Sequence, residues 1–382
     1  MSGVSTVRGV LDASRMVLVC GSGGVGKTTV SAALGLDVAR RAPRRVLVIT
    51  VDPARRLADA LGLHSSSFAG TDAVRVPGDG WQGELWVSML DTKAGWDELI
   101  RRHAPDRALA DRVLANPLYH NITSRFVNSH DYIAMEQLHH LDQRGEFDLV
   151  IVDTPPSRNA LDLIDAPRRM REFFASALLR WLTVPARSRL LSVATQPFNK
   201  VAERVLGSTF LQDITDFFVL LRTMEPGFVA RAAEVEALLG ADRTAFAVVT
   251  TGEESPSREA EFFVDELRRR RLPLRALLFN RVLPASFASE PASAAAGALG
   301  RVATDAVAVD AIALAAGAPP DGVAHVLGAV GQRFHEVRDR AVLEAERRTR
   351  LRGLAGEVAV HELPALDGDV HDLAGLLRLT VD

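Results

Sequence analysis

Two residue types that often define a protein's chemistry are scarce in this chain of 382 residues. Cys20 is the single cysteine, which excludes an intrachain disulfide and any metal site built from several cysteines. Lysine occurs only as Lys27, Lys93 and Lys200 among 45 lysines and arginines. A lysine inside a glycine-rich segment is therefore notable, because a slender ammonium fits beside phosphate oxygens where a planar guanidinium would crowd them.

Charge excess, a membrane span and a secretion signal are also missing. The formal net charge is -3, which gives no electrostatic reason to expect nucleic acid as a partner. The sequence has no apolar run of about 18 residues that would span a bilayer. Its first 20 residues lack the basic start, apolar stretch and small-residue cleavage site of a signal peptide. With 47% hydrophobic residues available for a core, we expect a cytoplasmic globular protein that does not bind nucleic acid.

Short apolar runs recur along the chain and predict buried strands. The first, at 16–20, ends at glycines, and a helical pattern of small and apolar residues follows at 27–41. Strands that alternate with helices indicate a parallel sheet with helices on both faces. We therefore expect an α/β fold with a mostly parallel, doubly wound sheet. The predicted strands are residues 16–20, 45–51, 85–90, 147–153, 245–251 and 274–280, with 357–362 as a further candidate.

Two stretches, 92–146 and 166–242, are too long to be simple crossovers between strands. Both carry helical periodicity and little strand signal, so we expect one helical subdomain inserted at an edge of the sheet. The whole chain, 1–382, is then a single domain with this insertion. Residues 284–299 are rich in small residues and predict a mobile loop, whereas residues 328–352 predict a charged helix.

A glycine-rich segment directly follows the first predicted strand and opens the first predicted helix. It satisfies the P-loop pattern G-x-x-x-x-G-K-[ST] in the strand-to-helix context that this pattern requires. In such a loop, backbone N–H groups converge on phosphate oxygens, the lysine contacts the β- and γ-phosphates, and the threonine hydroxyl binds Mg²⁺. A plain glycine-rich turn is the alternative, but the context favours ATP and Mg²⁺ as cofactors of a P-loop NTPase. The residues are Gly21, Ser22, Gly23, Gly24, Val25, Gly26, Lys27 and Thr28, and Thr29 follows.

Two aspartates end predicted strands at the edge where open parallel sheets bind ligands. Asp52 follows the second strand, where a carboxylate can orient the attacking water or bind Mg²⁺ through water. Asp153 follows the most apolar strand and matches the Walker-B residue that holds Mg²⁺. A capping or turn role is the alternative for each, because aspartate is common in turns.

The phosphate loop, the Asp52-Pro53-Ala54 segment and Asp153-Thr154-Pro155-Pro156 together resemble the ArsA-type family of arsenite-pump and tail-anchored-protein targeting ATPases. The resemblance covers essentially the whole chain, and it is strongest to the branch often labelled anion-transporting ATPase. It implies an enzyme that uses ATP and Mg²⁺ to switch a dimer and its helical client- or partner-binding subdomain.

The resemblance also implies roles for single residues. Asp52 and Lys27 are catalytic, and Asp52 positions the hydrolytic water. Thr28, Asp52 and Asp153 serve Mg²⁺. By the same resemblance, Asn280 contacts the adenine and Pro364 packs against it.

The chain departs from this family at Ser22, where the resemblance implies a lysine that reaches the ATP of the partner subunit. Such charges donated in trans are worth roughly 10³–10⁵ in rate in phosphoryl transfer. Three interpretations follow. The chain pairs with a paralogue that keeps the lysine, or it uses Arg55, Arg56 or Arg158 instead, or it is a slow switch with weak hydrolysis. We prefer the first, a heterodimer, over a homodimer.

Other departures narrow the function further. A single cysteine leaves neither the zinc-binding pair nor the arsenite-binding triad of other branches, so we expect no zinc and no arsenite. The client, a protein or a membrane partner, stays unnamed. The alternatives are a nucleotide-gated binding subunit and a Par- or Min-type positioning ATPase, which the near-neutral charge disfavours. Two apolar clusters in the insertion fit core packing or a partner surface: Phe173, Phe174, Leu178, Trp181 and Leu182, and Leu211, Ile214, Phe217, Phe218 and Leu221.

Overall fold

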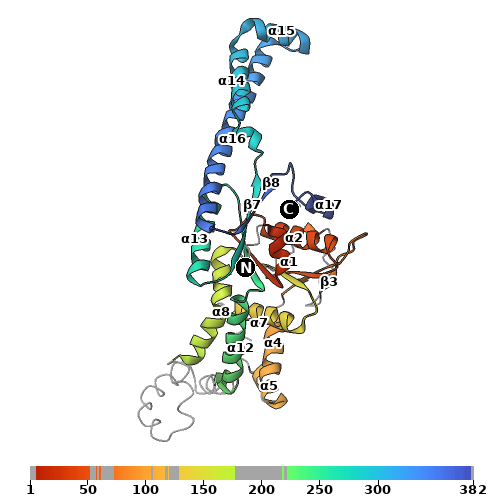
Figure 1. The fold of residues 1–382 in the computed structure, drawn as a ribbon, viewed down its shortest axis with the longest axis vertical. Helices are drawn as coiled ribbons and strands as arrows, with labels where there is room; N and C mark the ends of the chain where they lie inside the picture. Colours follow the sequence, from red (N-terminus) through yellow and green to blue (C-terminus); the bar gives the residue numbers. More distant parts are fainter. Residues whose placement is uncertain are drawn as a thin grey trace.

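The computed structural model describes residues 6–51, 57, 60–61, 73–90, 92–104, 106–116, 119, 129–176, 217–218 and 222–379. At its centre lies one eight-stranded sheet in the order β3-β4-β2-β5-β1-β6-β7-β8 (Figure 1). Each pairing in this sheet is parallel except that of β3 with β4, which confirms the expected α/β fold. The strands are β1 (Met16–Cys20), β2 (Arg45–Thr50), β3 (Val74–Arg75), β4 (Glu84–Met89), β5 (Leu149–Asp153), β6 (Thr244–Thr250), β7 (Leu274–Val282) and β8 (Ala359–Pro364).

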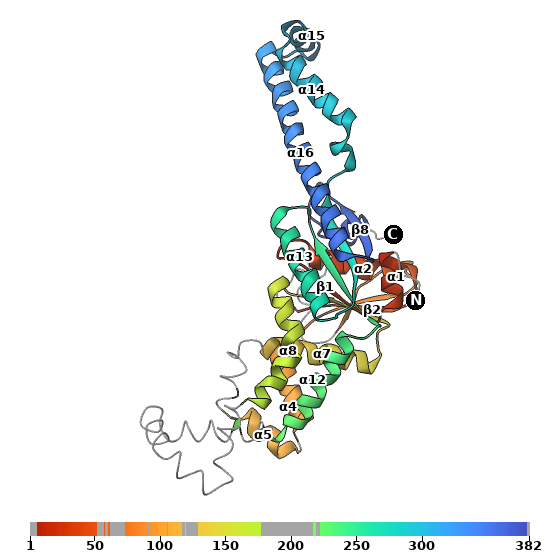
Figure 2. The ribbon, with the colours of Figure 1, turned by 60° about the vertical axis from the view of Figure 1, so that its left-hand side comes forward.

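The central strands are apolar on both faces because helices cover both faces. In β1, Val17 and Val19 belong to one core cluster, whereas Met16, Leu18 and Cys20 belong to the other, as the two-residue period of a strand requires. The first cluster packs against α1 (Val7–Ala13), α2 (Lys27–Arg41) and α17 (Leu373–Leu377). The second packs against α13 (Glu254–Arg269) and its neighbours, so that α13 and α1 lie on opposite sides of the strands in Figure 2.

A helical region lies beyond one end of the sheet and has its own core. Its helices are α4 (Thr92–His103), α5 (Arg107–Leu114), α7 (Ser129–Arg144), α8 (Ser157–Ala175) and α12 (Glu225–Leu239). They gather below the sheet in Figure 1 around a third apolar cluster that includes Tyr132, Phe174 and Phe228. These helices fall mostly within the two stretches predicted as an inserted subdomain.

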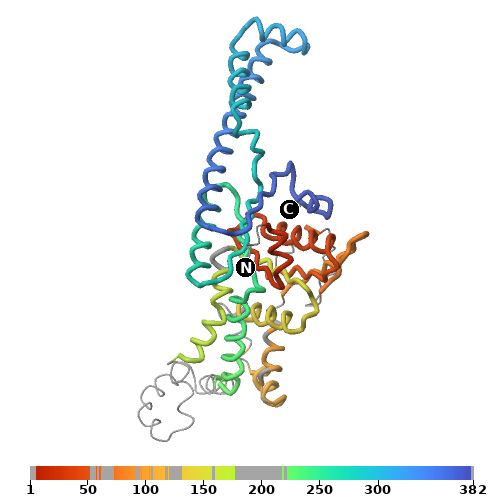
Figure 3. The backbone as a smooth tube through the Cα atoms, in the orientation of Figure 1, coloured from red at the N-terminus to blue at the C-terminus, as the bar shows by residue number. Residues whose placement is uncertain are grey.

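A long helical arm leaves the sheet on the opposite side, between β7 and β8 (Figure 3). The arm consists of η2 (Ala285–Ala288), α14 (Glu290–Thr304), α15 (Ala306–Ala316) and α16 (Pro320–Ala355). Since α16 has 36 residues, it is about 54 Å long at 1.5 Å per residue. The predicted charged helix at 328–352 is confirmed as part of α16.

The prediction of a mobile loop at 284–299 is wrong, because α14 occupies most of it. Its many alanines are strong helix formers, and Ser289 caps the helix by accepting a hydrogen bond from the Ala292 N–H. Small residues also let α14 pack closely on α16. A Cβ on Gly331 would lie only 3.4 Å from the Ala296 carbonyl oxygen and 3.5 Å from the Gly300 nitrogen.

The tip of the arm exposes aliphatic side chains. In α15, Val307 is 80% exposed and Leu314 is 86% exposed, whereas Val309 and Ala313 are buried against the arm. No single helix in the described residues is long and apolar enough to cross a membrane. α15 and α16 meet that criterion only when they are taken together, and they turn by 106° at the break between them.

Candidate nucleotide-binding site

The phosphate loop lies at the carboxyl edge of the sheet, between β1 and α2, and both of its ends are held against neighbouring strands. A Cβ on Gly21 would lie 2.1 Å from the carbonyl oxygen of Val249 in β6. A Cβ on Gly26 would lie 2.4 Å from Nδ2 of Asn280 in β7, and Gly26 also has a left-handed φ of 89°. Between these ends, a Cβ on Gly23 would meet no described atom within 4 Å. The middle of the loop is therefore open to a ligand.

Lys27 begins α2 and turns its side chain back across the loop. Its ammonium donates a hydrogen bond of 2.9 Å to the carbonyl oxygen of Ser22, and the residue is 8% exposed. An ammonium has three N–H donors, which suits it to phosphate oxygens. The structure thus places a buried cation inside a loop of backbone N–H groups, which is the environment that phosphate requires.

Asp153 meets two hydroxyls from other elements at this edge. The Thr28 hydroxyl donates to Asp153 Oδ2 at 2.7 Å, and the Thr50 hydroxyl donates to the same oxygen at 3.1 Å. The strand order explains this contact, because β5 lies between β1 and β2. The register sets Asp153 beside Val19 on one side and beside Thr50 on the other. The structure therefore brings together the two described residues that the sequence predicts for Mg²⁺.

Ser22 faces inward rather than toward solvent. It is 5% exposed, and its Oγ has no hydrogen-bond partner among the described residues. A buried, uncharged side chain does not supply a cation to a neighbouring subunit.

The ends of β7 and β8 carry the two residues predicted to contact adenine. Asn280 is 6% exposed, and its Nδ2 donates a hydrogen bond of 2.8 Å to the carbonyl oxygen of Val25 in the phosphate loop. Pro364 ends β8, is exposed, and pairs in register with Val282. Both residues thus lie at the same edge of the sheet as the phosphate loop, and their contacts with adenine stay predictions.

Cys20, the last residue of β1, is fully buried directly before the loop. Burial raises the pKa of its thiol to about 12, against the opposing effects of the Thr154 hydrogen bond and the Lys27 charge. The thiol is therefore protonated at neutral pH and behaves as a small apolar side chain, as the sequence suggests.

Several predicted site residues lie outside the described residues. They include Asp52 and the two arginines Arg55 and Arg56. Arg158 lies in the first turn of α8, but its side chain is also outside the described part. The catalytic role of Asp52 and the substitution of an arginine for the missing lysine therefore stay predictions.

The apolar clusters of the insertion pack inward where they are described. Phe174 and Phe217 are buried in the third cluster, and Phe174 lies 5.3 Å from Phe228 between ring centroids. Core packing, rather than a partner surface, accounts for these members. Phe173 and Phe218 are half-buried and pack against the same cluster. The other members, Leu178, Trp181, Leu182, Leu211, Ile214 and Leu221, lie outside the described residues.

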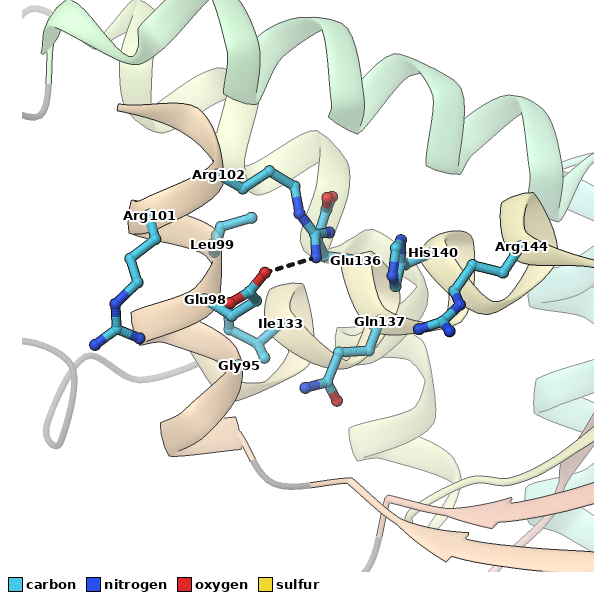
Figure 4. A pocket seen from close by; sticks show the side chains of 10 residues that line it. All are labelled: Gly95, Glu98, Leu99, Arg101, Arg102, Ile133, Glu136, Gln137, His140 and Arg144. Carbon is cyan, nitrogen blue, oxygen red and sulfur yellow. Dashed lines mark hydrogen bonds and ion pairs between the residues drawn. The ribbon is translucent and has the colours of Figure 1, made fainter. Parts of the chain in front are cut away.

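The helical region also contains a cavity of about 460 Å³ between α4 and α7 (Figure 4). It is lined partly by arginines, and one of them, Arg102, donates a hydrogen bond of 3.1 Å to Glu98. Within the described part of the chain, no group of three or more His, Cys, Asp or Glu side chains is arranged to hold a metal ion.

The fold and the loop together define a P-loop nucleotide-binding protein. The family model for anion-transporting ATPases matches residues 14–298. The chain therefore belongs to the anion-transporting ATPase family, a group of ATP-hydrolysing enzymes, and the predicted ArsA-type resemblance is confirmed.

Two relatives illustrate the range of similarity. The chain is 24% identical over 272 residues to the ATPase ASNA1 homolog of Entamoeba dispar, which covers 71% of this chain and 77% of that protein. It is 30% identical over 164 residues to the ATPase GET3 of Kluyveromyces lactis, which covers 40% of this chain and 45% of that protein.

The sequence prediction missed two parts of the site. Thr50 was assigned only to a strand, although a polar residue at the end of an apolar strand is a usable signal. The bond from Asn280 to Val25 joins residues 255 positions apart, and no local pattern reveals it. The position of Thr50 is thus visible in the sequence, whereas the contact of Asn280 with Val25 depends on the order of the strands.

Proposed function

We propose that this protein is a Mg²⁺-dependent ATPase in which ATP binding and hydrolysis switch a dimer and its helical subdomain between two states. The subdomain comprises residues 92–146 and 166–242. The observation that supports this most directly is the contact of Thr28 with Asp153 beside the buried ammonium of Lys27. These three residue types in this order are the phosphate- and Mg²⁺-binding set of P-loop NTPases.

The residues present fit Mg²⁺ and ATP. A hydroxyl and a carboxylate 2.7 Å apart offer oxygen ligands, and Mg²⁺ needs few from the protein because water and phosphate supply the others. Thr28 and Asp153 would hold Mg²⁺, which would supply positive charge to neutralise the phosphates. Lys27 exchanges the Ser22 carbonyl for a phosphate oxygen. Asp52 accepts a hydrogen bond from the attacking water and orients it.

Binding of Mg·ATP to Lys27→Ala tests the phosphate site. We expect binding to weaken about 10- to 100-fold, because hydrogen bonds to charged groups are worth about 1.5–3 kcal/mol. Lys27→Arg should recover little, since the guanidinium is too broad for the loop. Calorimetry measures the affinity, and an unchanged melting temperature shows that each variant is folded. A wild-type chain that binds no Mg·ATP would overturn the assignment.

The position of Ser22 supports a dimer with unequal subunits. Because its side chain is buried and uncharged, we propose that a paralogue with a lysine at this position completes the active site of this chain. The homodimer is the alternative. Native mass in the presence of Mg·ATP, measured on complexes from the source cell, distinguishes the two.

Ser22→Lys gives a gain-of-function test of the same idea. If two copies of this chain pair through the nucleotide face, the new lysine supplies the missing charge to each partner. We expect ATP turnover by the purified single chain to rise at least about tenfold, a small part of the 10³–10⁵ that such charges contribute. The control is Arg271→Lys, a charge-conserving change at an exposed position away from the loop. Full family-level turnover by the wild-type chain alone would contradict the paralogue model.

A nucleotide-gated binding subunit with weak hydrolysis is the second candidate. Ser22 favours it, because a chain without the lysine still binds ATP through Lys27 and Thr28. In this case, single-turnover hydrolysis stays slow even when a lysine-bearing partner is added. Acceleration by that partner supports the first candidate instead.

A further inference from the structure

The end of β7 contacts the phosphate loop through one side chain. Asn280 donates from Nδ2 to the carbonyl oxygen of Val25 at 2.8 Å, and its Oδ1 accepts from the Arg281 N–H at 2.9 Å. Asn280 is 6% exposed. Its amide lies so close to Gly26 that a Cβ on that glycine would be 2.4 Å from Asn280 Nδ2. Both polar ends of the amide are therefore bonded to backbone, one of them inside the loop.

The backbone at this point is irregular in a way that serves the contact. The register between β7 and β8 shifts between Phe279 and Val282, so the ladder is interrupted at Asn280 and Arg281. Arg281 has a φ of 57°, a left-handed conformation that is unfavourable for a residue with a Cβ. At this irregularity the Arg281 N–H donates to Asn280 Oδ1.

Arg271 has the same φ of 57° for an ordinary reason. It follows the C-cap of α13, and its N–H bonds to the carbonyl oxygen of Arg268 while the Leu272 N–H bonds to that of Leu267. Left-handed residues are common at this position after a helix. Arg281 has no helix end to explain it and lies instead in the irregularity of the β7–β8 ladder, a feature that is common next to active sites.

We propose that Asn280 and the backbone of Arg281 position the phosphate loop for binding of the polyphosphate, independently of any contact with the base. The Arg281 N–H fixes the orientation of the amide. The amide holds the Val25 carbonyl, and Val25 and Gly26 immediately precede Lys27. Loss of this bond frees the part of the loop whose N–H groups and lysine receive the phosphates.

The inference rests on the proposed phosphate site, and inorganic tripolyphosphate separates positioning from base contact. This probe has phosphates and no base. We expect Asn280→Ala to weaken binding of Mg·ATP and of Mg·tripolyphosphate by a similar factor, about tenfold, with the ratio of the two affinities unchanged. A residue that only contacts adenine leaves tripolyphosphate affinity at the wild-type value, and this result overturns the inference.

Asn280→Leu is the second variant, because it keeps the size and shape of the side chain and adds no charge beside the loop. It loses the donor to Val25, so we expect it to weaken tripolyphosphate binding as well. It keeps the measurement available if Asn280→Ala fails to fold.

Arg281 is tested by its backbone rather than its charge. Both Arg281→Ala and Arg281→Val remove the guanidinium, but a β-branched residue adopts the left-handed region less readily. We expect Val to weaken tripolyphosphate binding several-fold more than Ala does. Equal losses assign the effect to the guanidinium and contradict the positioning role.

Arg271→Val is the matched control, since it makes the same change at the same φ outside the site. We expect it to lower the melting temperature without changing either affinity. If wild-type protein binds neither Mg·ATP nor Mg·tripolyphosphate, the proposed function fails. If it binds both and Asn280→Ala binds tripolyphosphate equally well, only the present inference fails.

Discussion

Single oxygen atoms decide the chemistry of this site. Asp153 Oδ2 accepts hydrogen bonds from the hydroxyls of Thr28 and Thr50. These two threonines lie 125 and 103 residues from Asp153 in the sequence. Each hydroxyl stabilises the ionised carboxylate, which is the form that binds a divalent cation. The same strand ends that create the sheet edge therefore also place the proposed metal ligand.

A second carboxylate, Asp131 in α7, offers a prediction about pH. Burial first and then the nearby charge of Asp162 raise its pKa to about 6, against the opposing charge of Arg169. Since the folded protein holds this proton more tightly than the unfolded chain, stability falls as pH rises from about 4 to 6. Above pH 6 the buried carboxylate is ionised, and the full loss of folding stability is present. We expect Asp131→Asn to raise the melting temperature at pH 7.5 by a few degrees, and by less at pH 4.5.

Thermal scans at the two pH values measure this effect. Asp369→Asn, at an exposed site, is the control and should change neither value. An equal gain at both pH values would show that the amide stabilises by some contact other than removal of a buried charge.

At the scale of elements, the sequence predicted what burial makes visible. Strands such as β5 and β6 are buried along their whole length, so they appear as continuous apolar runs. β3 was missed because it has two residues and is partly exposed. The order of the strands, and therefore the meeting of Asn280 with Val25, depends on packing between distant segments that no local pattern encodes.

The arm is the element for which the sequence prediction is wrong. Its alanine-rich first helix was predicted as a loop, because small residues and prolines are also typical of loops. Its stability comes from pairing with α16, where Gly331 permits the close approach of Ala296 and Gly300. The alanines of α14 are a usable helical signal, whereas its pairing with α16 is not visible locally because the partner lies more than 30 residues away.

The exposed tip of the arm gives a prediction at this scale. We expect Val307→Asp with Leu314→Asp to leave the melting temperature within about 1 °C, because surface substitutions rarely exceed 0.5 kcal/mol. The double variant should bind less of the dye 8-anilinonaphthalene-1-sulfonate and scatter less light at high concentration, since exposed apolar patches favour association.

Val309→Asp is the matched comparison, because this side chain is buried against the arm. It should lower the melting temperature, since it buries a charge. If the exposed pair proved equally destabilising, α15 would have a packing partner in solution that the single chain lacks.

At the scale of the whole molecule, ligand binding and stability are linked. A ligand at 100 times its Kd stabilises the folded state by about 2.7 kcal/mol. For a chain of this length we expect Mg·ATP to raise the melting temperature by about 4 °C. The rise should fall to about half or less in Lys27→Ala and be reduced when EDTA removes Mg²⁺. A rise of the same size in Lys27→Ala would place the nucleotide elsewhere on the molecule.

The scarcity of lysine and cysteine has a practical consequence for the arm. Between Arg301 and Arg333 the chain has no lysine or arginine, so trypsin releases Val302–Arg333 as a single peptide that reports the tip by mass. Cys20 is fully buried with a pKa of about 12, and a thiol introduced by Leu314→Cys is then the one reactive sulfur at neutral pH. In the proposed dimer, a spectroscopic label attached there would report the distance between the two tips as nucleotide is bound and hydrolysed.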